Sequence, residues 1–435
     1  MRFVKLGLAA AAVLVSGQAA QAATTEEIAA AAAKIQPKVV TWRRDFHQHP
    51  ELGEQETRTA GIVAKHLKDL GFEVRTGVAK TGVIGVLKGG KPGGVVALRA
   101  DMDGLPVEEK TGLPFASKAK GVWEGKEVPV MHACGHDTHV AMLMGAAEVL
   151  AGMKDQIQGT VVLIFQPAEE GMQAGAGIGG AQVMVKEGVL NNPKVDAIFG
   201  IHIGPGEPGV LNWRSGGFYA SADRITIKLK GRQTHGARPW SGVDLSSAAS
   251  EIVTALNGVA ARQLDVTASP TIITIATMHG GVRNNIIPED FVMEGTLRTF
   301  SDARNADAKA RIEKTVKGIA DTWGATAEVG FDGFYPVTYN DPALTKWAEP
   351  SLVRATGGKI EANGDLVTGA EDFSFFAQKV PGLYLQLGGR KAQYKAGESP
   401  VNHSPYFDID EKVLETGVKA HVTLAMDYLA SKAGK

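Results

Sequence analysis

The chain of 435 residues, 44% of them hydrophobic, is long enough to bury a large core and to divide into two domains. Its 46 basic and 47 acidic residues give a formal net charge of −1, so the sequence offers neither a basic footprint for nucleic acid nor a polyanionic tail. We therefore expect a small-molecule partner and no nucleic acid.

The first 23 residues are typical of an export signal. Two basic residues precede the apolar run 6–15, and the small-residue segment 20–22 fits a cleavage site. The alternative is a membrane anchor, but the apolar run is far shorter than the roughly 20 residues that a spanning helix needs. No later stretch is long enough either. We expect the mature chain to be periplasmic or secreted, outside any membrane.

After the signal, an Ala-rich helix is predicted to begin at Thr24 or Thr25 and to end before Pro50. We interpret Arg43 and Arg44, near its end, as a solvated helix terminus. A second helix is predicted within 54–70, where apolar residues recur at helical spacing. A third, almost wholly apolar helix is predicted over 138–153, with a cap at Asp137 or Thr138.

Buried strands alternate with these helices, which predicts an α/β fold with a mostly parallel sheet and helices on both faces. Such sheets bind their ligands beyond the carboxyl ends of the strands. Five polar residues fall just past predicted strand ends, and we expect them to converge: Asp101, Asp103, Glu169, Glu170 and His202. The predicted strands are 83–87, 95–100, 160–165, 195–201 and 382–387.

The segment from Asp223 to Phe331 breaks this rhythm. Its predicted elements follow the order β-α-β-β-α-β, which is that of a ferredoxin-like unit. We therefore predict a domain inserted at 216–331, between the two parts of a first domain at 24–215 and 332–435. The predicted strands of the insert are 225–229, 271–278, 291–300 and 325–331, and its helices are 246–264 and 303–323.

Cys134 is the single cysteine and lies among three histidines in the segment 131–140. Because one cysteine cannot form a disulfide within the chain, a free thiol in an oxidising compartment suggests a ligand role. In an extended loop residues i and i+2 point to one side, so Cys134 and His136 would reach the same metal ion. The alternative is a small buried hydrophobic residue beside a histidine that caps a helix.

Glu169 and Glu170 are adjacent, and neighbouring side chains diverge along an extended backbone. One can therefore bind a metal ion while the other removes a proton from the metal-bound water. The alternative is a pair of solvated loop acids.

Two rival functions remain. The segment 175–180 matches G-x-G-x-x-G, but it does not directly follow a strand end, so we interpret it as a loop rather than a dinucleotide site. An exported binding protein that does not turn its ligand over is the other alternative.

Six motifs, in order along nearly the whole mature chain, resemble those of the aminoacylase, hippurate hydrolase and plant auxin-conjugate amidohydrolase family. Carboxypeptidase G is a more distant relative. The motifs are Phe46–Glu51, Arg99–Asp103, His132–His139, Pro167–Gly171, Gly369–Phe373 and Asn402–Pro405.

The resemblance implies a catalytic domain that binds two divalent metal ions, and an inserted lid domain through which the chain forms a homodimer. Glu169 would be the general base. Carried over by motif, the metal ligands would be Cys134, His136, Glu170, His202 and His403.

Three lid residues also match. His235 resembles a histidine that reaches a neighbouring subunit's active site and stabilises the oxyanion, and Asn285 and Arg298 match positions that hold the substrate's free carboxylate. An arginine can grip a carboxylate with two parallel hydrogen bonds. Without the resemblance, His235 would be interpreted as a surface-loop residue and Arg298 as a charge at a strand edge.

The chain departs from the carboxypeptidase branch, because Asp101 replaces a histidine and Cys134 supplies a thiolate, as in the hippurate hydrolase branch. This set of donor atoms is compatible with Mn, Zn, Ni and Co and does not distinguish among them. The resemblance implies hydrolysis of the amide bond of N-acyl amino acids, which gives a carboxylic acid and a free amino acid. The alternative is a dipeptidase or carboxypeptidase on the same scaffold.

Overall fold

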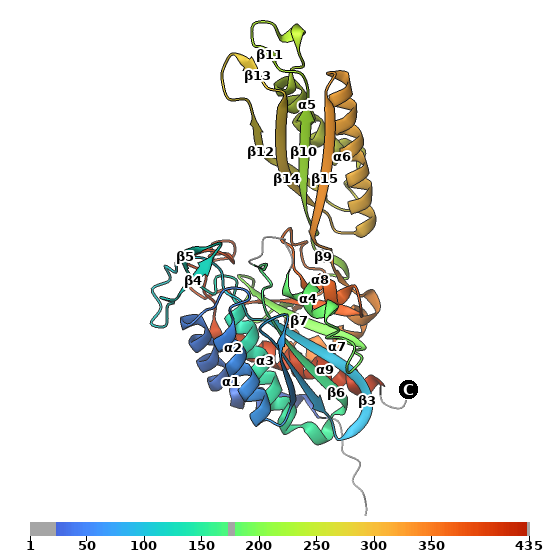
Figure 1. Cartoon of the computed structure of the whole chain (residues 1–435). Coiled ribbons are helices and arrows are strands. Elements are labelled where there is room, and N and C mark those ends of the chain that lie inside the picture. The colour runs from blue at the N-terminus through green and yellow to red at the C-terminus, as the bar shows by residue number, and fades with distance from the viewer. Residues whose placement is uncertain (1–22, 173–178, 433–435) are drawn as a thin grey trace, which may run out of the picture.

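The computed structural model describes residues 23–172 and 179–432 (Figure 1). The predicted export signal lies outside the described residues, apart from Ala23, and stays a prediction. Most of the rival glycine segment, 175–180, lies outside them too. Among the described helices, none combines the length and apolarity that a bilayer span requires.

An eight-stranded sheet forms the centre of the molecule, and its middle strands β6, β3, β7 and β18 run parallel. The predicted fold class is therefore confirmed. The sequence pattern found the buried strands but missed β1, β8 and β17, which are short or exposed. In spatial order the strands are β1 (Glu73–Val78), β2 (Gly82–Lys88), β6 (Gln158–Gln166), β3 (Lys91–Asp101), β7 (Ala197–Gly204), β18 (Gly382–Gly388), β8 (Leu211–Asn212) and β17 (Ile360–Glu361).

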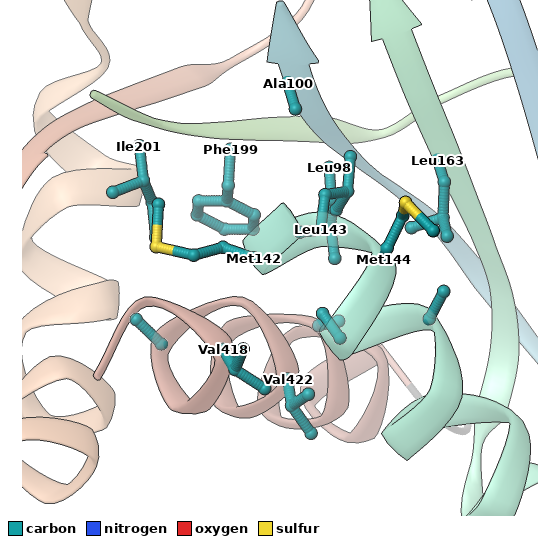
Figure 2. Packing of buried hydrophobic residues seen from close by; sticks show 14 of the residues in the cluster. Leu98, Ala100, Met142, Leu143, Met144, Leu163, Phe199, Ile201, Val418 and Val422 are labelled. Atoms are coloured by element: carbon teal, nitrogen blue, oxygen red, sulfur yellow. The ribbon is translucent and has the colours of Figure 1, made fainter. Parts of the chain in front are cut away.

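Both faces of this sheet are buried, because alternate side chains of each strand point to opposite faces. Along β3, Val96 and Leu98 belong to one apolar cluster and Ala97 to another. Figure 2 shows Leu98, Leu163 and Phe199 facing α3 and α9. The helices of that face are α1 (Thr25–Gln48), α2 (Thr57–Asp69), α3 (His136–Gly152), α7 (Pro342–Thr356) and α9 (Leu414–Lys432); those of the other are α4 (Gly180–Lys186) and α8 (Phe373–Ala377).

The first helix begins as predicted. Thr24 caps α1 by accepting a hydrogen bond from the amide of Glu27, whose side chain accepts one from the Thr24 amide in return. Its last turn differs from the prediction, because Arg43 is only 2% exposed. The Arg43 guanidinium binds the carboxylates of Asp137, Asp408 and Glu411, so only Arg44 lies at a solvated helix end.

The predicted cap of α3 was wrong. Gly135 is the N-cap, with φ of 96°, and no side chain caps the helix. Asp137 is instead buried in the first turn, where its carboxylate accepts hydrogen bonds from Arg43 and His47. Two smaller differences concern loops: α4 begins at Gly180, in a segment interpreted as a loop, and His202 lies inside β7 rather than past its end.

A separate four-stranded sheet, which we call the second sheet, stands beyond the central one (Figure 1). Its order β12-β14-β10-β15 is that of the predicted ferredoxin-like unit, and it runs from Ala222 to Tyr335. One face is covered by two helices. The elements are β10 (Ala222–Lys230), α5 (Leu245–Gly258), β12 (Ile272–Gly280), β14 (Asp290–Arg298), α6 (Asp302–Thr322) and β15 (Thr326–Tyr335).

Three two-stranded sheets complete the strands of the described residues. They are β4 (Lys120–Trp123) with β5 (Lys126–Pro129), β9 (Gly216–Tyr219) with β16 (Thr338–Asn340), and β11 (Thr234–His235) with β13 (Ile286–Ile287). The β9/β16 pair lies next to the chain segments that enter and leave the second sheet. Short helical turns occur at Lys154–Gln156, Pro239–Ser241, Val259–Gln263 and Glu411–Val413.

Candidate metal centre

A cavity of about 530 Å³ opens where the carboxyl ends of the parallel strands meet the base of the second sheet. Residues from both sheets line it. From the central part come Cys134, Glu169, Glu170, His202, His403, Tyr219, Glu371 and Gln386, and from the second sheet come Arg224, Arg298, Phe334 and Tyr335. The cavity therefore brings metal-binding groups, carboxylates and two cations together.

The five predicted metal ligands lie in one cluster. The Cys134 Sγ atom is 3.4 Å from His202 Nε2, and His403 Nε2 is 3.1 Å from a carboxylate oxygen of Glu170. Two sets of donor atoms share Cys134, and within each set the atoms lie within 4.8 Å of one another: Cys134 with His136 and His202, and Cys134 with Glu170 and His403. Two overlapping sets of donors suit two neighbouring ions.

The imidazole rings are oriented as metal ligands usually are. His136 directs Nδ1 to the backbone oxygen of Asp103 at 2.9 Å, and His202 directs Nδ1 to the backbone oxygen of Ile203 at 2.7 Å. Each ring therefore presents Nε2 to the cluster. The Nε2 atom of His136 is buried without a hydrogen-bond partner, which is costly unless a further group binds it. The residues present thus fit a metal ion.

Burial raises the pKa of the Cys134 thiol well above its ordinary value, and the Glu170 carboxylate raises it further. The thiol therefore keeps its proton while no cation lies beside it. A metal ion that binds here must displace this proton, so we expect metal affinity to rise with pH.

His139 supports the site without being a ligand. Its Nδ1 donates to Asp101 at 2.5 Å, and its Nε2 accepts from the amide of Ile203 at 2.8 Å. Both ring nitrogens are thus occupied. Burial alone would raise the pKa of Asp101, but the Arg99 guanidinium and the nearby imidazoles hold it well below its usual range.

Glu169 and Glu170 are held by one carboxylate behind them. The amides of both residues donate to Asp103, each at 3.0 Å, and Ala168 before them adopts a positive φ of 50°. This turn brings both side chains to the cluster rather than letting them diverge as predicted, since a carboxylate oxygen of each lies within 4.8 Å of the other and of a His136 ring nitrogen. Burial raises the pKa of Glu169 well above its ordinary value, with further contributions from Glu371 and Glu170. A carboxylate with a raised pKa is a stronger base.

Arg99 is a buried residue of β3 to which the sequence analysis gave no separate role. Its guanidinium binds Asp101 at 2.6 Å and both Glu371 and Asp372 at 2.9 Å. It therefore balances part of the negative charge that gathers beside Glu169. A charged residue inside an otherwise apolar strand was the signal that could have singled it out.

The predicted lid residues are divided between two places. Arg298, at the end of β14, is half-buried and lines the cavity, and burial lowers its pKa. His235 and Asn285 lie at the far tip of the second sheet, where the amide of Gly236 donates to the Asn285 carbonyl. Both are exposed and neither lines the cavity of its own chain.

A cluster of thiol, imidazole and carboxylate donors at the carboxyl edge of a parallel sheet is the arrangement that a metal-dependent hydrolase needs. Residues 97–427 match the model of peptidase family M20/M25/M40. The chain belongs to this family, whose members are metal-dependent hydrolases of amide bonds, and the predicted family resemblance is confirmed.

Two curated relatives and one solved structure illustrate what this chain is similar to. Thermostable carboxypeptidase 1 of Saccharolobus solfataricus is 44% identical, over 91% of this chain and 96% of the relative. The IAA-amino acid hydrolase ILR1-like 2 of Arabidopsis thaliana is 37% identical, over 92% and 88%. The crystal structure of a dinuclear metal-binding peptidase of the M20 family from Bacillus subtilis has a TM-score of 0.77 and 32% identity, and the match covers 92% of this chain and 99% of that one.

Glu56 provides a pH-dependent test of how the loop before Glu169 is held. Its buried carboxyl accepts from the amide of Ala168 at 2.8 Å and from the hydroxyl of Thr81 at 2.5 Å. Burial and the nearby Asp103 raise its pKa from 4.5 to about 8. The folded state therefore binds the proton more tightly than the unfolded state, and Glu56 makes folding less favourable as pH rises from 4.5 towards 8.

We predict that Glu56→Gln becomes more stable than the wild type as pH rises, because Gln cannot ionise. Its amide oxygen can accept from Ala168, and its NH2 group can donate to the Thr81 hydroxyl, as a protonated Glu56 would. Thermal unfolding at about pH 5 and about pH 9 measures this, with the larger difference at the higher pH. The exposed Glu328→Gln is the matched control and is expected to show no such trend. Equal differences at both pH values would mean that Glu56 is not protonated in the folded chain.

Proposed function

We propose that the chain hydrolyses the amide bond of N-acyl amino acids and releases a carboxylic acid and a free amino acid. The observation that carries this proposal is the shared cavity, in which the buried carboxylate of Glu169 lies beside the metal-ligand cluster and Arg298 lines the same space. A general base, a Lewis-acid site and a carboxylate-binding cation are the parts that this reaction needs. The name of the Saccharolobus solfataricus relative favours a second candidate, a carboxypeptidase, which would use the same parts.

Cys134, His136, Glu170, His202 and His403 would hold two divalent ions. When bound, such ions lower the pKa of a water molecule and polarise the carbonyl of the amide. Thiolate, imidazole and carboxylate donors together suit Mn, Zn, Ni or Co, and the metal is therefore left to experiment.

Glu169 would move the proton. Its carboxylate takes a proton from the attacking water and later delivers it to the nitrogen of the leaving amine, so that atoms and charge balance over the cycle. Asp103 fixes the backbone on which this side chain stands.

Arg298 would bind the free carboxylate of the amino-acid product half. Arg224 lies on the same face of the second sheet, because it pairs with Thr296, two residues before Arg298. Its guanidinium packs over the ring of Phe334, 5.0 Å from the centroid, within the same cavity. This second cation strengthens the preference of the cavity for anionic substrates.

His235 and Asn285 would act in a neighbouring copy of the chain, as part of a homodimer formed through the second sheet. Their exposure at the tip of that sheet supports this proposal. The aromatic side chain of Trp240, in the adjacent turn, is 79% exposed, as expected of a surface that another chain covers. We also propose that the mature protein is exported after removal of residues 1–23.

Amino-acid release from N-acetyl amino acids, N-benzoyl amino acids and dipeptides tests the function. We expect chelated protein to be inactive, and Mn, Zn, Ni or Co to restore release from at least one N-acyl class. Release from dipeptides alone would transfer the assignment to a dipeptidase or carboxypeptidase. If no substrate of the panel released an amino acid while metal was shown to be bound, the proposal would be contradicted.

Glu169→Gln should lower kcat about 10²- to 10⁴-fold, because the amide cannot accept the proton. Metal content, measured by elemental analysis, should stay at the wild-type level. The neighbouring Glu170→Gln is the matched comparison and should lose metal as well as activity, since Glu170 belongs to the ligand sets. Wild-type turnover by Glu169→Gln would disprove the role of Glu169.

Arg298→Met should lower kcat/KM for an N-acyl amino acid about 10- to 100-fold through the loss of a charged hydrogen bond. The same substrate with its carboxylate converted to an amide should be almost unaffected by the substitution. Lys228→Met, on the exposed face of β10 and outside the cavity, serves as the control. If both substrates lose activity equally, Arg298 does not bind the carboxylate.

A further inference from the structure

Tyr335 connects the second sheet to the loop of the general base. It is the last residue of β15 and pairs with Ala222, the first residue of β10, at the base of the second sheet (Figure 1). Its phenol donates a hydrogen bond of 2.6 Å to the backbone carbonyl of Glu169. The ring is fixed from the side by an edge contact with Phe375, 6.1 Å between centroids.

The loop that Tyr335 contacts is also held by two carboxylates outside the second sheet, one just past β3 and one at the start of α2. Asp103 accepts from the amides of Glu169 and Glu170, and Glu56 accepts from the amide of Ala168. Among the hydrogen bonds found for the described residues, that of Tyr335 is the one that reaches this loop from the second sheet. Burial raises the pKa of Tyr335 above its ordinary value, so the phenol remains a donor.

A polar cluster beside Tyr335 ties β10 to α6 at the base of the second sheet. Asp223, in β10, binds Lys309 and Asn305 of α6, each at 2.6 Å. The hydroxyl groups of Ser221 and Thr299 lie 2.9 Å apart and join the entries to β10 and α6. Because Tyr335 pairs with Ala222 next to this cluster, we expect a rotation of the second sheet relative to the central one to move the phenol of Tyr335 with it.

We propose that Tyr335 is a positioning residue that ties the orientation of Glu169 to the position of the second sheet. It does not touch the reacting atoms. Because Ala168 before Glu169 adopts a left-handed conformation, the loop carries backbone strain that its anchors must hold. The second sheet carries Arg298, so the residue that would bind the substrate and the residue that would move the proton are linked through one phenol. The catalytic part of this inference rests on the proposed role of Glu169.

The test is Tyr335→Phe, which keeps the ring and removes the donor. Hydrogen exchange of the peptide covering 166–172 should accelerate by about threefold or more, whereas exchange in the β4–β5 hairpin should not change. With a substrate that the wild type hydrolyses, kcat should fall about 3- to 10-fold, and KM and metal content should change little. Tyr339→Phe, the same change at a 47% exposed position of β16, is the control.

A double-mutant cycle with Lys309→Met separates coupling from local loosening. Lys309→Met breaks the ion pair with Asp223 and should accelerate loop exchange while the phenol is present. In the Tyr335→Phe background it should add almost nothing, because the link is already lost. Unchanged loop exchange in Tyr335→Phe would overturn the proposal whatever the enzyme's substrate is. Faster exchange with unchanged kcat, or fully additive effects, would overturn the positioning role.

Discussion

The carboxylate of Asp103 contacts both the imidazole of His136 and the backbone of Glu169 and Glu170, and so fixes these groups relative to one another. One of its oxygens lies 3.2 Å from His136 Nδ1 and accepts the amide of Glu169, and the other accepts the amide of Glu170. A buried carboxylate is costly unless several donors satisfy it, and here the donors are the residues that the chemistry needs. Because Asp103 is the second residue after β3, the strand places its carboxylate at the carboxyl edge of the sheet.

Charge balance then explains why so many ionisable groups are buried together. The single guanidinium of Arg99 faces Asp101, Glu371 and Asp372, and the carboxylates of Glu169 and Glu170 lie close by. One cation cannot offset this many acids, which leaves an excess of negative charge. Burial raises the pKa of Glu169 and of Asp372 well above their ordinary values, and the neighbouring carboxylate of Glu371 raises both further. Divalent ions held by the adjoining thiol and imidazole groups would offset that excess negative charge. We therefore expect the cluster to be more stable with metal ions bound than without them.

The sequence predicted the site residues whose positions depend on where a strand ends or on a short spacing along the chain. Glu170 and His202 converge because they lie at the carboxyl ends of the parallel strands β6 and β7, which periodicity reveals. Cys134 and His136 were predicted from their i, i+2 spacing at the start of α3. The burial of Arg43 could not be predicted, since its partners Asp408 and Glu411 lie at the opposite end of the chain. The same holds for the contact of Tyr335 with Glu169, and for His235, whose predicted role needs a second chain that one sequence does not place.

The central claim is that the buried cluster is a metal centre in which Cys134 is a ligand. Titration of metal-free protein with Co²⁺, followed by absorption of the thiolate-to-cobalt band and by return of amide hydrolysis, tests it most directly. We predict that binding saturates at about two ions per chain. The thiolate-to-cobalt band should be present in the wild type and absent in Cys134→Ser. Amide hydrolysis by protein that binds no metal, or binding with no thiolate band, would contradict the account.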